Sequence, residues 1–153
     1  MSETDQRPII GRKEQIGFIG LLLSAFSAPF TMAFLIGAIA DEFTNATRGE
    51  IGTIATLELF SISVLSIIVS RNIYRINMKI VFVVGVLVVA LGHLITIYSP
   101  NLEIVYIARI IAGIGSGIIV ATIMANVAKA QNAQMTFALI NSGVGAAGVL
   151  LSL

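Results

Sequence analysis

The apolar run from Ile104 to Ala125 constrains the fold of this chain more than any other stretch. It is long enough to cross a bilayer as a helix, which takes about 20 apolar residues. Arg109 lies near its start, and a charge inside a membrane helix is costly, so we expect Arg109 to face a partner or a watery cavity. Small residues at four-residue spacing allow a second helix to approach closely in lipid. Here these helix-packing residues are Gly113, Gly117, Ala121 and Ala125.

The composition indicates an integral membrane protein. Of the 153 residues, 57% are hydrophobic and 11% are charged, whereas a soluble domain usually carries roughly a quarter charged residues. The formal net charge of +1 and the lack of a basic patch interleaved with aromatic residues give no case for a nucleic-acid partner. With no cysteine, the chain has no disulfide framework, thiolate metal site or cysteine nucleophile.

The hydropathy pattern predicts an all-α, polytopic helix bundle, with a polar tail at residues 1–15 and one membrane domain over residues 1–153. The five transmembrane helices are expected at 16–40, 51–70, 80–98, 104–125 and 135–153. A cleavable signal peptide is the alternative for the first apolar segment, because Ala38-Ile39-Ala40 resembles a cleavage site. However, the apolar region exceeds the roughly 7–15 residues of a signal core, and further apolar segments follow, so we reject cleavage.

The cations predict the orientation. With five spans, one side of the membrane carries Arg7, Arg12, Lys13, Arg71, Arg75, Lys79 and Lys129, whereas the loops on the other side carry only Arg48. Cytoplasmic loops are enriched in Lys and Arg. We therefore expect a multi-pass protein of the plasma (inner) membrane with its N-terminus in the cytoplasm.

Glu58 and Arg109 are the candidates for chemistry inside the membrane. At 1.5 Å per residue, Glu58 lies roughly 12 Å and Arg109 roughly 8 Å from the outer ends of their helices. We expect the two to face one another or a shared cavity, because each ion alone in lipid would be costly. Glu58 would then carry a coupling proton, with Arg109 tuning or releasing it. The alternative is a static buried bridge that fixes the helix register.

Other polar residues in the apolar segments are weaker candidates. The possible cavity-lining residues are Ser24, Ser27, Thr31 and Asn141. Hydroxyl groups that bond to their own helix backbone are the alternative for the first three. His93, near the outer end of its segment, is expected to be a hydrogen-bonded interfacial residue rather than a proton carrier.

The linker from Ser70 to Lys79 resembles the cytoplasmic loop signature of the major facilitator superfamily, Gly-x-Leu-Ala-Asp-Arg-x-Gly-Arg-Arg. Arg75 and Lys79 match its basic positions. Ser70, Tyr74 and Asn77 stand where the signature has its first Gly, its Asp and its second Gly. Without that Asp, the charge relay associated with this loop is incomplete.

The stretch from Ala108 to Gly117 is similar to the fourth-helix signature of the same superfamily, an Arg followed by Gly-x-Gly-x-Gly. In proton-coupled members this arginine is associated with proton transfer, which the resemblance assigns to Arg109. The Gly-rich stretch from Asn141 to Gly148 resembles the fifth helix of the drug antiporters, without the Gly-Pro pair of that subgroup.

The resemblance implies a proton-coupled secondary active transporter, of the antiporter kind, that moves a small molecule by alternating access. Only the first five of the usual twelve helices are covered, so we expect a fragment whose remaining helices, or an oligomeric partner, complete the pathway. A small membrane scaffold without transport activity is the rival interpretation. We expect no enzyme and no cofactor, because His-Glu-x-x-His, Gly-x-Ser-x-Gly and phosphate-loop motifs are missing from the sequence.

Overall fold

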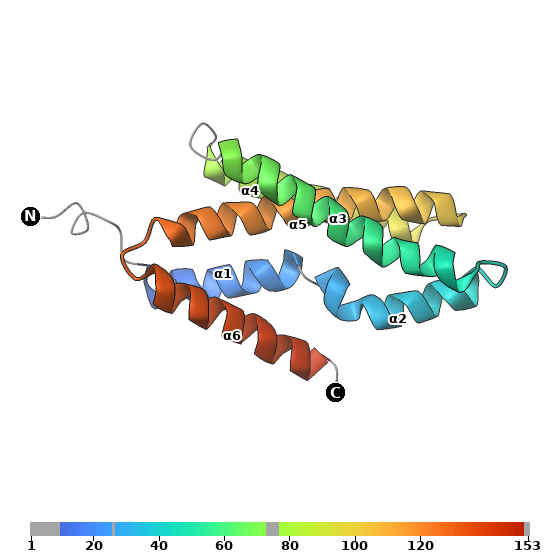
Figure 1. The fold of residues 1–153 in the computed structure, drawn as a ribbon, viewed down its shortest axis with the longest axis horizontal. Coiled ribbons are helices and arrows are strands. Elements are labelled where there is room, and N and C mark those ends of the chain that lie inside the picture. Colours follow the sequence, from blue (N-terminus) through green and yellow to red (C-terminus); the bar gives the residue numbers. More distant parts are fainter. Residues whose placement is uncertain (1–9, 26, 73–76, 152–153) are drawn as a thin grey trace, which may run out of the picture.

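The structure is a computed structural model, and it describes residues 10–25, 27–72 and 77–151. All secondary structure in these ranges is helical, so the predicted all-α class is confirmed for this part of the chain. The helices are α1 (Arg12–Ala25), α2 (Ser27–Glu42), α3 (Arg48–Asn72), α4 (Met78–Ile97), α5 (Leu102–Ala128) and α6 (Ala133–Leu151). Figure 1 shows them lying along one long axis, with α1 and α2 end to end.

Three of these helices, α3, α4 and α5, are long and apolar enough to cross a membrane. Helices α3 and α5 contain the predicted spans at 51–70 and 104–125, and α4 covers the predicted span 80–98 except for its last residue. The first predicted span, 16–40, falls on α1 and α2, and the last, 135–153, falls on α6. The five-span topology is therefore supported for three spans, and the other two stay predictions.

Polar side chains at the ends of the apolar segments set the helix boundaries. Helix α3 begins earlier than expected because Thr47 and Glu50 form a reciprocal cap. The Thr47 backbone N–H donates to Glu50 Oε2 at 2.7 Å, and the Glu50 backbone N–H donates to Thr47 Oγ1 at 3.3 Å. Asn77 accepts from the Lys79 backbone N–H at 3.1 Å, and Asn101 accepts from that of Ile104 at 3.0 Å. These two asparagines fix the first turns of α4 and α5.

Helix α5 packs between α3 and α4, and its glycines allow both contacts. A Cβ atom on Gly113 would lie 2.6 Å from the Glu58 carbonyl oxygen, and one on Gly117 would lie 2.7 Å from that of Ile62. These two predicted packing residues therefore face α3. Further along the predicted seam, Ala121 is buried against Val69 of α3, with Ala125 packed alongside.

The opposite face of α5 forms a second close contact, with α4, which the four-residue spacing did not reveal. A Cβ on Gly115 would lie 2.6 Å from the Val89 backbone nitrogen, and one on Gly92 would lie 2.6 Å from that of Ala112. Gly115 is two positions from Gly113, and two residues turn a helix through roughly 200°. The glycine run is therefore double-sided.

Helices α1 and α6 attach to this group through hydrogen bonds at one end and through an apolar core. The Ile10 backbone N–H donates to Asn132 Oδ1 at 3.1 Å, and Asn132 Nδ2 donates to the Ile10 carbonyl at 3.0 Å. Gln15 Nε2 adds a hydrogen bond to Thr136 Oγ1 at 3.3 Å. An apolar core joins Leu22 of α1 and Ile140 of α6 to α5.

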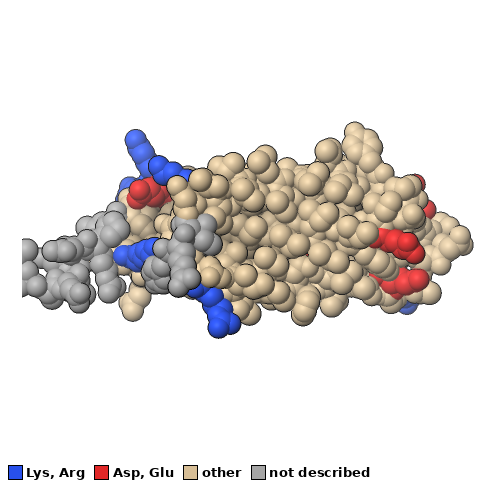
Figure 2. All heavy atoms as spheres, turned by 90° about the horizontal axis from the view of Figure 1, so that it is seen from above, with Lys and Arg blue, Asp and Glu red and all other residues tan. Residues whose placement is uncertain are grey.

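The charged side chains gather at the two ends of the long axis. Figure 2 shows Lys and Arg mostly at one end, most Asp and Glu at the other, and a wide uncharged belt between them on the visible face. The cationic end contains the start of α1 with Arg12 and Lys13, the end of α3 with Arg71, and the start of α4 with Lys79. This distribution is typical of a membrane-embedded bundle.

Candidate functional site

The main polar feature inside the uncharged belt is a buried ion pair between α3 and α5. Arg109 Nη1 lies 3.5 Å from Glu58 Oε2, and the exposed fractions of the two side chains are 1% and 0%. The two side chains are thus in contact, as expected from their similar distances to the outer ends of their helices. The charges neutralise one another in a place where either alone would be costly.

Helix α4 adds two side chains to this pair. Arg109 Nη2 donates a hydrogen bond to Thr96 Oγ1 and lies 3.3 Å from His93 Nδ1. The Thr96 hydroxyl donates to the Gly92 carbonyl at 2.9 Å, so its oxygen is oriented to accept from the arginine. One guanidinium group therefore links all three candidate membrane helices.

The contact with Arg109 defines the protonation state of His93. A guanidinium group carries only donors, so His93 Nδ1 must be the acceptor. The ring is then neutral, and its proton is on Nε2. His93 is hydrogen-bonded, as expected, but its partner is the buried charge cluster rather than the membrane interface.

The hydrogen bonding of the ion pair is incomplete. Among the described residues, neither carboxylate oxygen of Glu58 accepts a hydrogen bond, and Arg109 Nε donates none. A buried ion pair is favourable only when good geometry and further hydrogen bonds offset the cost of desolvation. Within the described part of the chain, the Glu58 carboxylate therefore has acceptor positions that no donor occupies.

The glycines that allow close helix packing also position the charges. Gly113 is one turn after Arg109 and contacts the backbone of α3 at Glu58 itself. Gly92 immediately precedes His93 and contacts α5 at Ala112. The small residues therefore bring the backbones close enough for the side chains of Glu58, Arg109 and His93 to meet.

The remaining predicted site residues lie apart from this cluster. Asn141 is exposed and donates to the Phe137 carbonyl of its own helix at 2.8 Å. Ser70 likewise donates to the Ser66 carbonyl at 2.6 Å, Asn77 caps α4, and Lys79 is exposed. The side chains of Ser24, Ser27 and Thr31, and the whole of Tyr74 and Arg75, lie outside the described residues.

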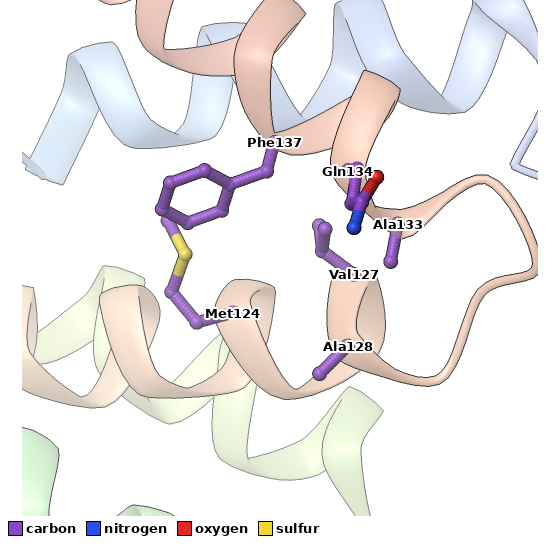
Figure 3. Close-up of a pocket in the computed structure, with 6 residues that line it drawn as sticks. All are labelled: Met124, Val127, Ala128, Ala133, Gln134 and Phe137. Carbon is purple, nitrogen blue, oxygen red and sulfur yellow. The ribbon is translucent and has the colours of Figure 1, made fainter.

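An apolar pocket of about 420 Å³ lies between the adjoining ends of α5 and α6 (Figure 3). Its lining residues are Met124, Val127, Ala128, Ala133, Gln134 and Phe137. None of these is ionisable, and the pocket is separate from the charge cluster. The described residues also contain no group of three or more His, Asp or Glu side chains placed to hold a metal ion.

Thr96 and the role of His93 were missed from the sequence. The signal that could have found them is the short turn between α4 and α5, which places residues before the turn opposite residues after it. His93 and Thr96 are three positions apart and share a helix face.

No protein family, curated protein or solved structure matches this chain.

Proposed function

We propose that the chain forms part of a secondary active transporter that couples the movement of a small molecule to protons. The observation that carries this proposal is the fully buried Glu58 carboxylate, paired with Arg109 at 3.5 Å and lacking a hydrogen-bond donor among the described residues. An ionisable residue inside a membrane helix is by default a candidate for function, because its cost would otherwise select against it. Glu58 is the proposed proton carrier.

The proposed cycle uses the two charge states of Glu58. Ionised, the carboxylate attracts Arg109 and ties α3 to α5. Protonated, it loses that attraction, and Arg109 keeps only its contacts with His93 and Thr96 of α4. Proton binding would therefore change which helices are held together, which is what alternating access requires of a coupling site.

The resemblance to the major facilitator superfamily defines the wider proposal. The chain would supply five helices of the N-terminal half in the inner membrane, with its N-terminus in the cytoplasm. These helices would work together with further helices or an oligomeric partner. Antiport is the proposed mode. The cations that gather at one end of the bundle support the orientation, because the positive-inside rule assigns that end to the cytoplasm.

A scaffold protein that uses its small-residue seams to bind other helices is the competing function. Gly113 and Gly117 already contact α3, and Gly115 contacts α4. These seams are thus filled within the chain, which favours the transporter proposal. A static structural bridge between Glu58 and Arg109 is the remaining alternative, and it requires an experiment.

The test is flux into liposomes that contain this chain reconstituted together with the remaining helices of the transporter or with its oligomeric partner. A panel of small organic ions and drugs would be assayed with and without an imposed pH gradient, using an entrapped pH dye. We expect Glu58→Gln to abolish gradient-driven flux. Glu50→Gln is the matched control on the same helix, because Glu50 is exposed and glutamine also completes the cap with Thr47. Undiminished gradient-driven flux in Glu58→Gln would rule out the proton-carrier role.

A further inference from the structure

His93 lies where its protonation must affect Arg109. Its Nδ1 atom accepts from Arg109 Nη2 at 3.3 Å, which only a neutral ring with an unprotonated Nδ1 can do. A proton on Nδ1 would convert the acceptor into a donor. It would also place two cations in contact inside a buried cluster.

The displaced guanidinium has a second place to bind. Arg109 Nη1 is already 3.5 Å from Glu58 Oε2, and no donor among the described residues occupies either Glu58 oxygen. A small rotation of the arginine toward α3 would exchange the contact with His93 for hydrogen bonds to Glu58. Arg109 faces His93 from α5, and Glu58 lies beyond it on α3, so both charges favour this movement.

The packing around His93 makes the exchange consequential. Gly92, the preceding residue, lies against the Ala112 backbone, so the backbones of α4 and α5 are packed closely there. Loss of the His93 contact leaves that interface with its packing and the hydrogen bond from Arg109 to Thr96. A proton on His93 therefore weakens the link between α4 and α5 while strengthening the link between α3 and α5.

We propose that His93 is a proton-operated positioning residue that determines whether Arg109 is held mainly by α4 or by α3. This switch would regulate the charge cluster, so the inference rests on the proposed transport function. A proton on His93 moves Arg109 toward α3, whereas a proton on Glu58 releases Arg109 toward α4. Two protonatable groups thus compete for one arginine.

The test uses nitrogen-15 NMR of the protein in lipid nanodiscs. His93 is the one histidine of the sequence, so with a histidine-free affinity tag its ring signals are unambiguous. We expect the neutral ring to carry its proton on Nε2. The histidine titration should differ from that of the wild type both in Arg109→Gln, which removes the facing cation, and in Glu58→Gln, which removes the nearby carboxylate. A neutral ring protonated on Nδ1, or a titration unmoved in both variants, would overturn the proposal.

A second measurement follows the arginine itself. Its guanidinium signals, assigned by their loss in Arg109→Lys, should shift as the histidine titrates. His93→Asn is the matched control, because it keeps an acceptor oxygen near the position of Nδ1 but cannot take up the proton. We expect no such shift in that variant, and an identical shift would overturn the switch. Neither measurement involves a substrate, so loss of the switch is distinguishable from loss of proton-driven flux.

Discussion

Two regions of the molecule are built on different principles. Helices α3, α4 and α5 are joined by glycines that bring their backbones together and by a buried charge cluster. Helices α1 and α6 are joined by hydrogen bonds at one end and by an apolar core shared with α5, and α6 exposes large apolar side chains along its length. The difference implies that the first region tolerates little change, whereas the second is adaptable. Substitutions in each region can test this contrast.

The largest effect is expected from removal of the arginine. Arg109→Ala leaves the Glu58 carboxylate buried without its counter-ion and should destabilise the protein by about 3–5 kcal/mol. Thermal unfolding in nanodiscs, followed by circular dichroism, would measure this loss. The double variant Arg109→Ala/Glu58→Ala should recover much of it, because no charge then stays unpaired. Additive losses in the double variant would show that the two residues are not coupled.

The glycine seams provide the second comparison. Gly113→Ala forces a methyl group to within 2.6 Å of the Glu58 carbonyl, so it should cost about 1–3 kcal/mol and disturb the charge cluster. Gly145→Ala in α6 is the matched control, since a Cβ there meets nothing within 4 Å. It should stabilise its helix by up to about 1 kcal/mol. Equal effects on the unfolding temperature would contradict the contrast between the two regions.

The most local effect is expected at the α1–α6 connection. Asn132→Ala removes both hydrogen bonds to Ile10, each contributing about 0.5–1.5 kcal/mol, and leaves the charge cluster untouched. Hydrogen exchange should increase at the start of α1 but stay unchanged around Arg109. Faster exchange throughout α5 would mean that the two regions depend on one another.

The sequence was a good guide to the second, third and fourth predicted spans and to the Glu58–Arg109 contact. Apolar length and the cost of a lone charge in lipid determine these features directly. The reverse face of α5 and the roles of His93 and Thr96 could not be read from residue spacing within one helix. They depend on which helix lies opposite, and that is decided by packing among all the segments.

The central claim is that Glu58 exchanges a proton inside the helix bundle. Infrared difference spectroscopy of the protein in nanodiscs, titrated between about pH 4 and 9, tests it most directly. We predict a protonated-carboxyl band that appears on acidification, persists in Glu50→Gln and is lost in Glu58→Gln. Identical difference spectra for the wild type and Glu58→Gln would contradict the account and leave the ion pair as a static bridge.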